Sequence, residues 1–201
     1  MSAPTARAYQ LVLHAGDPHW APDAVGLVAE ALADLGLLGD AFVHADAVHY
    51  RPGPAFLDAV MFLGCSPAIA LEPDGAAGAA GGADPAAFCN TRLGPVSSAV
   101  QFRRGCGDIP PWCPRCRARV PDWQPLIDAW RRDPDGYRWI CPDCGHARSP
   151  VDLHWRHDAG FGRFFVEIWG IHPHEAVPSE RLLATLTAIG GGSWRYFYAR
   201  S

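Results

Sequence analysis

Hydrophobic positions near the N-terminus predict a strand, a helix and a second strand. The apolar, partly β-branched stretch Tyr9–His14 is typical of a strand. Residues 22–38 carry apolar side chains three and four positions apart, which predicts a helix with Pro22 in its first turn and a glycine at its end. Apolar and polar residues are interleaved over 41–50, so we expect the second strand there.

The same order of elements returns at the C-terminal end. Residues 161–171 form a long apolar run, which predicts a strand. A helix is expected over Glu180–Ile189, because its leucines fall on one face, Ser179 is a favourable N-cap and three glycines follow at 190–192. Residues 194–198 predict the last strand.

The middle of the chain gives less regular patterns. Apolar positions over 56–63 indicate a short helix that ends at Gly64, and residues 69–71 predict a buried strand. The glycine- and alanine-rich stretch 73–85 is expected to be a loop. The remaining predicted elements are a turn over 51–54, strands over 89–93 and 99–103, and a loop over 172–179.

Strand-helix-strand units at both ends of the chain predict an α+β fold. If the two units share one antiparallel or mixed sheet, they form a ferredoxin-like α/β sandwich. A stretch rich in cysteine, glycine and proline separates them, and we expect it to be an inserted zinc ribbon with four cysteine ligands. The expected limits are 1–105 for the first half of the α+β domain, 106–158 for the zinc-ribbon insert and 159–201 for the second half.

Two Cys-x-x-Cys pairs carry the clearest chemical signal. Cys113 and Cys116 form the first pair, and Cys141 and Cys144 form the second. Two intervening residues let both sulfurs of a tight turn reach one ion, and backbone amides of such a turn stabilise the thiolates. Gly145 permits the positive φ that turns the chain around the metal. The four cysteines therefore predict one closed, four-sulfur metal site.

The sequence Cys-Pro-x-Cys-Gly resembles the knuckles of zinc-ribbon and rubredoxin-like proteins, over residues 112–149. This resemblance implies a structural Zn²⁺, one per chain, and often a binding surface. Iron in the same four thiolates is the second option. The 24 residues between the pairs exceed the spacing of many ribbons, so we expect a short helix over Gln124–Arg132.

Composition and charge exclude several classes of function. All 17 basic residues of the 201-residue chain are arginines, so it has no lysine nucleophile, Schiff base or P-loop lysine. The net charge of −4 excludes a strongly cationic nucleic-acid binder. The bias toward alanine, glycine, proline and arginine fits a GC-rich coding sequence, and we expect a bacterial source.

Cysteine usage and hydrophobicity predict the compartment. The start of the chain has no apolar signal core, and the longest apolar stretch, 55–71, contains Asp58 and Pro67 and is short for a membrane span. Seven cysteines, four of them in two pairs, indicate metal binding in a reducing compartment. We therefore expect a cytoplasmic protein without a membrane partner.

Aromatic and basic residues in the cysteine region allow two interpretations. The tryptophans either form the small core around the metal or stack on nucleic-acid bases, with arginines on the phosphates. Residues 101–163 hold 11 arginines against 8 acidic residues, a small positive excess for nucleic-acid binding. The tryptophans are Trp112, Trp123, Trp130, Trp139 and Trp155. The arginines are Arg103, Arg104, Arg115, Arg117, Arg119, Arg131, Arg132 and Arg138.

Histidines in two loops predict a second site as an alternative. His154 and His157 would share one face of a helix, and His172 and His174 follow the long C-terminal strand beside Glu175. Together these residues would hold a second metal or supply a general acid or base. The competing interpretation is that they are solvated loop histidines. The same two interpretations apply to His14, His19, His44 and His49.

The three remaining cysteines have simpler interpretations. Cys65 is either a nucleophile at a turn or a buried, unreactive thiol. Cys106 is a candidate fifth ligand, but the four cysteines of the two pairs already occupy the coordination positions of one ion. Cys89 is expected in the core.

Three functions follow from these patterns. The first is a zinc-stabilised protein without enzymatic activity that binds another protein, and it predicts one Zn²⁺ per chain. The second is an enzyme that uses the histidines His154, His157, His172 and His174, and it predicts a second metal. The third is nucleic-acid binding through the arginine- and tryptophan-rich ribbon, and it predicts a steep salt dependence.

Overall fold

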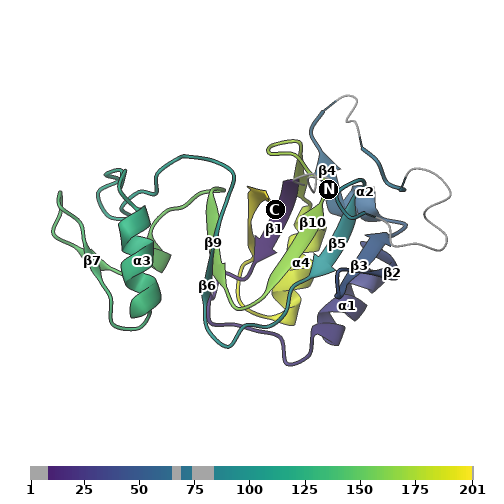
Figure 1. The fold of residues 1–201 in the computed structure, drawn as a ribbon, viewed down its shortest axis with the longest axis horizontal. Helices are drawn as coiled ribbons and strands as arrows, with labels where there is room; N and C mark the ends of the chain where they lie inside the picture. Colours follow the sequence, from purple (N-terminus) through teal and green to yellow (C-terminus); the bar gives the residue numbers. More distant parts are fainter. Residues whose placement is uncertain (1–8, 65–68, 74–83, 201) are drawn as a thin grey trace, which may run out of the picture.

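The computed structural model describes residues 9–64, 69–73 and 84–200, and its largest element is a six-stranded sheet (Figure 1). In order across the sheet, the strands are β12 (Arg195–Arg200), β1 (Tyr9–His14), β10 (Phe165–Trp169), β5 (Asn90–Leu93), β3 (Ala47–Pro52) and β2 (Leu38–His44). All neighbouring strands are antiparallel. Because β1 lies between β10 and β12, the two ends of the chain share one hydrogen-bonded framework.

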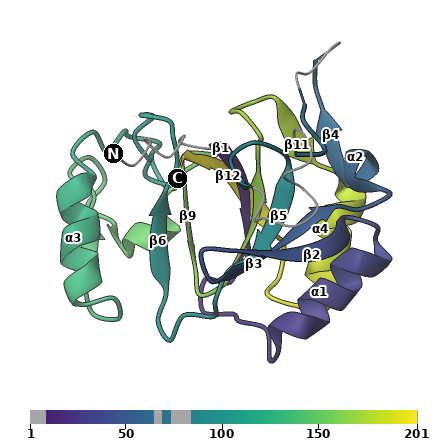
Figure 2. The ribbon, with the colours of Figure 1, turned by 45° about the vertical axis from the view of Figure 1, so that its right-hand side comes forward.

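Two helices, α1 (Val25–Asp34) and α4 (Glu180–Ile189), pack side by side on one face of this sheet (Figures 1 and 2). The core between helices and sheet is apolar and fully buried. Each buried leucine-sized side chain contributes about 2 kcal/mol, so this layer supplies much of the driving force for folding. Its members with no exposed surface include Leu11, Leu13, Val28, Leu32, Val166, Ile168, Leu182 and Leu186.

The remaining elements form small sheets and short helices around this layer. A third longer helix is α3 (Gln124–Arg132), and α2 (Phe56–Ala59) is a single turn. Within the described ranges, no helix is long and apolar enough to cross a membrane. The paired short strands are β4 (Val60–Phe62) with β11 (Ala176–Pro178), β6 (Gln101–Arg104) with β9 (Ala159–Gly162), and β7 (Trp139–Ile140) with β8 (Ala147–Arg148).

The mixed α and β class is confirmed, and several elements lie where the sequence predicts them. Strand β1 and helices α3 and α4 have the predicted limits. The predicted N-cap is confirmed, because the Ser179 hydroxyl accepts a hydrogen bond from the Leu182 amide at 3.2 Å. All three glycines after α4 have positive φ, which ends the helix.

Two predicted strands are wrong. Residues 41–50 form the hairpin β2–β3 instead of one strand, because Ala45 and Asp46 both adopt positive φ, 46° and 63°, as tight hairpin turns require. The run 161–171 is divided between β9 and β10, which belong to different sheets. The residue before β10, Phe164, is 1% exposed and lies in the core. The apolar sequence pattern therefore runs through the break between β9 and β10 and does not reveal it.

Other predicted limits also differ from the structure. Helix α1 is shorter than 22–38, and the helix expected over 56–63 changes into β4 after one turn. Residues 69–71 are no strand, although Ile69 and Leu71 pack against the core. The loop 172–179 contains β11. Most of the 73–85 loop and Cys65 lie outside the described residues.

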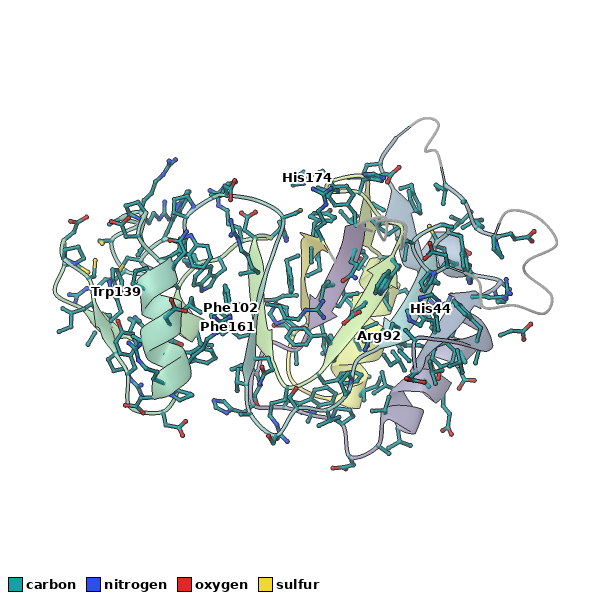
Figure 3. The ribbon with its side chains drawn as sticks, viewed as in Figure 1. His44, Arg92, Phe102, Trp139, Phe161 and His174 are labelled. Carbon is teal, nitrogen blue, oxygen red and sulfur yellow. The ribbon has the colours of Figure 1, made fainter. Side chains whose placement is uncertain are left out.

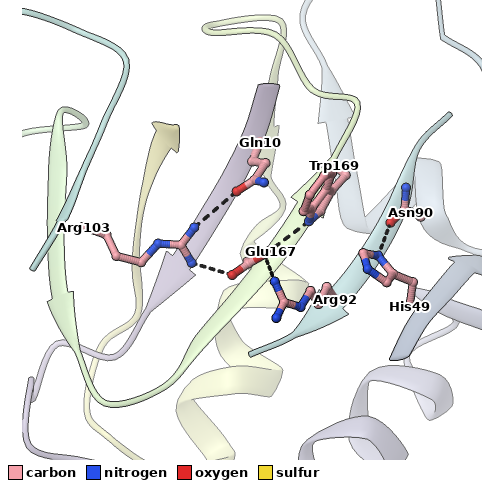
Figure 4. Close-up of polar contacts among 7 residues, drawn as sticks. All are labelled: Gln10, His49, Asn90, Arg92, Arg103, Glu167 and Trp169. Atoms are coloured by element: carbon pink, nitrogen blue, oxygen red, sulfur yellow. Dashed lines mark hydrogen bonds and ion pairs between the residues drawn. The ribbon is translucent and has the colours of Figure 1, made fainter. Parts of the chain in front are cut away.

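The face of the sheet opposite the helices carries a buried carboxylate, Glu167 on β10 (Figure 4). Glu167 accepts a hydrogen bond from Arg103 at 2.5 Å, forms a second ion pair with Arg92 at 3.6 Å and accepts a bond from the Trp169 indole at 3.2 Å. Arg103 also donates to the Gln10 side-chain oxygen at 3.3 Å. Because Arg103 belongs to β6, these contacts attach the β6–β9 pair to the large sheet.

We expect Glu167→Gln to lower the free energy of unfolding by about 2 kcal/mol, because hydrogen bonds to a charged group contribute about 1.5–3 kcal/mol each. Because Arg92 and Arg103 are partly exposed, water can replace the carboxylate as their hydrogen-bond partner, and this limits the loss of stability. Urea denaturation followed by tryptophan fluorescence measures the change. The control Glu30→Gln, exposed on α1, should stay within about 0.5 kcal/mol of the unsubstituted protein. Equal losses in the two variants would contradict the assigned role of Glu167.

Candidate metal centre and adjoining groove

Two turns of the same geometry present the four cysteines of the paired motifs. In each turn, the amide of the residue after the second cysteine donates to the carbonyl of the first cysteine at 2.9 Å. That residue has positive φ in both turns, 64° at Arg117 and 66° at Gly145, which confirms the predicted role of the glycine. The amide of the first cysteine donates to the carbonyl two residues after the second, at 2.9 Å and 3.1 Å.

The four sulfurs converge on one point. Sγ of Cys113 lies 3.8 Å from Sγ of Cys144, and Sγ of Cys116 lies 3.6 Å from Sγ of Cys141. All four sulfurs lie within 4.8 Å of one another. These separations exceed the sulfur–sulfur bond of a disulfide, about 2.05 Å, and all four cysteines are free. The arrangement therefore fits four ligands around a single metal ion.

The environment of the cluster favours a thiolate at Cys113. Burial raises the pKa of this thiol, but the backbone amides of Cys116 and Arg115 and the neighbouring thiols outweigh burial and lower the pKa to about 7. At Cys116 the Ala118 amide lowers the pKa, whereas burial and the three neighbouring thiols raise it to about 12. The cluster thus stabilises one negative charge, on Cys113, and disfavours a second one on Cys116. Four thiolates at this spacing therefore require a cation between them.

An aromatic core joins the cysteine turns to the β6–β9 pair. Figure 3 shows Phe102 and Phe161 on the side of α3 that faces the sheet, with Trp139 on the far side. The rings of Trp130 and Phe161 lie 5.2 Å apart, edge to face. Trp123, Trp130 and Trp155 are all less than 10% exposed. Three of the five tryptophans in this region therefore serve packing.

No other described side chains form a comparable metal cluster. Across residues 9–64, 69–73 and 84–200, the four cysteines are the one group of three or more His, Cys, Asp or Glu side chains placed to hold an ion. Cys106 is exposed and does not belong to this group. Cys89 is buried as expected, and burial raises the pKa of its thiol to about 12, so it is unreactive at neutral pH.

Three of the four predicted histidines lie against tyrosine rings, and two of these, His157 and His174, lie close enough to Asp158 to interact with its carboxyl charge. The His157 ring stacks on Tyr196 with centroids 4.3 Å apart, and its Nδ1 lies 2.9 Å from the Tyr196 carbonyl. His172 contacts the Tyr9 ring at 4.7 Å, and His174 contacts the Tyr198 ring at 5.0 Å. The Glu175 carboxylate accepts a hydrogen bond from the backbone amide of His172 at 3.1 Å. His154 belongs to a different surface, a groove beside the cysteine turns.

This groove separates residues 105–158, which we call the cysteine segment, from the end of β1. Two adjoining cavities of about 540 Å³ and 260 Å³ share the residues Gly16, Leu153 and Arg195, so they form one depression, which we call the junction groove. A third hollow of about 320 Å³ continues it past His154 and Arg156 to Trp112.

Arginines dominate the charged lining of the junction groove, and no sequence pattern indicates this set because its members are dispersed from 117 to 195. Two acidic residues, Asp135 and Asp152, also line the groove. The four ion pairs found in the described part of the chain involve none of its arginines. The lining arginines are Arg117, Arg138, Arg148, Arg156 and Arg195.

Comparison with protein-family models, with curated proteins and with solved structures finds no match for this chain.

We expect Gly145→Ala to weaken metal binding about fivefold, because a non-glycine residue at this φ costs about 1 kcal/mol. An added Cβ would have no atom within 4 Å, so the cost lies in the backbone alone. Competition with a chromophoric chelator measures the affinity. Arg117→Ala is the matched control, because Arg117 occupies the equivalent position of the first turn at a φ of 64°. Arginine and alanine both carry a Cβ, so this variant should bind the metal with unchanged affinity. An unweakened Gly145→Ala variant would contradict the argument.

We expect the free energy of unfolding to fall in acid because of His14, which lines the junction groove. Burial is the main reason why the pKa of His14 falls from 6.5 to about 4. Between these pH values the unfolded chain binds a proton that the folded chain excludes, so unfolding becomes easier as the pH falls from 6.5 to 4. The contribution reaches about 3 kcal/mol at pH 4 and vanishes above pH 6.5.

Urea denaturation at successive pH values tests whether His14 causes this acid sensitivity. The variant His14→Gln cannot take up the proton and serves as the comparison. Between pH 6.5 and pH 4 the unfolding free energy of the unsubstituted protein should fall by about 3 kcal/mol relative to that of the variant. Parallel curves for the two proteins would show that His14 does not cause the acid sensitivity.

Proposed function

We propose that this chain is a zinc-stabilised protein that binds another protein, with one Zn²⁺ on Cys113, Cys116, Cys141 and Cys144. The observation that carries the proposal is the convergence of the four sulfurs. A tetrahedral Zn²⁺ with bonds of about 2.3 Å places its sulfur ligands about 3.8 Å apart. The two closest pairs, at 3.8 Å and 3.6 Å, fit this spacing. Thiolates favour Zn²⁺, and iron is the second choice.

The role of this ion is structural. Four thiolates fill a tetrahedral site, so water or substrate has no coordination position and hydrolysis at this centre is unfavourable. The binding energy of the ion would instead stabilise the turns and α3. Free thiols at this spacing are also suited to a reducing compartment such as the cytoplasm.

The shape of the molecule supports an interaction role. The cysteine segment projects from the sheet and connects to it through the β6–β9 pair (Figure 1). It presents Ile140, which is 64% exposed, and the half-buried rings of Trp112 and Trp139. Exposed apolar and aromatic side chains of this kind are typical of protein–protein interfaces. Base stacking has less support, because the other three tryptophans of the segment are buried.

The topology supports the finer description of the fold that we propose, a ferredoxin-like sandwich with an inserted zinc ribbon. The order β12-β1-β10, with α1 after β1 and α4 before β12, is the order of two interleaved strand-helix-strand units. Strands β5 and β3 would be additions between β10 and β2. The pairing of Arg104 with Ala159 supports insert limits near 106 and 158.

Elemental analysis of protein purified without added metal tests the proposal. We expect one zinc per chain, and we expect Cys141→Ser to lose it and to change the tryptophan fluorescence, since the segment loses its fold. The matched control is Cys106→Ser, an exposed cysteine outside the cluster, which should keep both the metal and the spectrum.

Two metals per chain would instead favour the enzyme that uses His154, His157, His172 and His174. If the protein contains iron in place of zinc, the proposal that the bound ion is Zn²⁺ is wrong. Tight, strongly salt-dependent binding of single-stranded nucleic acid by the zinc-loaded chain would favour the nucleic-acid alternative.

A further inference from the structure

We infer that the junction groove is the docking site for an acidic segment of the partner protein, a sequence rich in aspartate and glutamate. The inference rests on the proposed function, because it assigns the surface and the chemistry of that interaction. Five arginines against two aspartates give the groove a positive lining, although the whole chain carries a net charge of −4. The positive charge is therefore local to this surface.

The arginines of the groove are free to bind a carboxylate. Arg138 donates to the backbone carbonyls of Asp135 and Tyr137 at 2.8 Å and 2.9 Å, which are neutral acceptors. Within the described residues, neither Arg148 nor Arg195 takes part in an ion pair. A planar guanidinium with unused donors binds a carboxylate through two parallel hydrogen bonds.

Two buried donors without partners lie on residues of the groove. They are Nε of Arg148 and Nε1 of Trp112, which have no hydrogen-bond acceptor. A buried donor without an acceptor costs about 1–3 kcal/mol, and because both atoms are shielded from solvent, a ligand oxygen would recover this energy once the side chains that cover them move. Both atoms donate and neither accepts, which favours a ligand with acceptor groups such as carboxylates and peptide carbonyls.

The surroundings of Trp112 favour a peptide over a nucleic acid. The Arg156 guanidinium lies 4.0 Å from the centre of this ring, and the Arg119 guanidinium lies 5.9 Å from it. A base would have to displace these cations before stacking on the ring. Carboxylates of a peptide would instead bind the arginines where they lie. The three hollows share His154 in their lining, so they offer an extended peptide a continuous surface.

Fluorescence anisotropy of the zinc-loaded full chain tests the inference. The probe is a fluorescein-labelled peptide of alternating glutamate and glycine, compared with the same peptide carrying glutamine and with a single-stranded oligonucleotide of equal charge. We expect the glutamate peptide to bind, with an affinity that falls as salt is added, and the glutamine peptide not to bind. The double variant Arg148→Gln, Arg195→Gln should bind it at least about tenfold more weakly.

Arg181→Gln is the matched control, because this exposed arginine lies on α4, outside the groove, and its removal should change the affinity by less than about twofold. Zinc content and thermal unfolding of each variant confirm that the fold is retained. Equal losses in the control and the double variant, no binding of the glutamate peptide, or tighter binding of the oligonucleotide would each overturn the inference.

The two proposals fail in different ways. If the glutamate peptide does not bind while the chain retains one zinc and a protein partner at another surface, the groove assignment alone is wrong. If the chain holds two metals and turns over a substrate with its histidines, the proposed function is wrong, whatever the peptide does.

Discussion

The segment between β6 and β9 depends on contact between two turns that are far apart in sequence. Cys116 and Cys141 are separated by 25 positions, yet their sulfurs lie 3.6 Å apart. Packing alone gives this part of the chain a small core of aromatic rings. Gathering four thiols raises the cost of ionising more than one of them, so the cluster is stable as a set of thiolates only around a cation. Helix α3 is itself held by this core, in which Ile127 and Trp130 are buried.

The elements with strong local signals could be predicted from the sequence. Helix α4 has a capping serine, leucines on one face and terminal glycines, and its observed limits are the predicted ones. The two cysteine pairs encode their own turns, because hydrogen bonds within each turn fix the geometry. In these places the residues that set the limits of the element lie within a short stretch of chain.

The remaining features depend on contacts between distant residues. The turn at Ala45 and Asp46 lacks the glycine or asparagine that marks most hairpins, so residues 41–50 resemble one strand. The break before β10 is hidden because Phe164 is itself a core residue. The junction groove was inaccessible to sequence reasoning, since Arg138, Arg148 and Arg195 meet only after β12 and the cysteine segment are placed. The tyrosine rings beside His157, His172 and His174 come from β1 and β12, so the spacing of the histidines in the sequence could not indicate these neighbours.

The pairing of β6 with β9 makes the cysteine segment a side branch of the main framework. The chain leaves the framework after Arg104 and returns at Ala159, its direct partner across the two strands. Cys106 and His157 also hydrogen-bond to Tyr198 of β12, so the part that could be excised without changing the order of the six-stranded sheet is 107–156, and the four residues left between β6 and β9 would close a hairpin. The same geometry would allow an unrelated metal-binding branch to be grafted at this position, with Arg103 and Glu167 still holding its base.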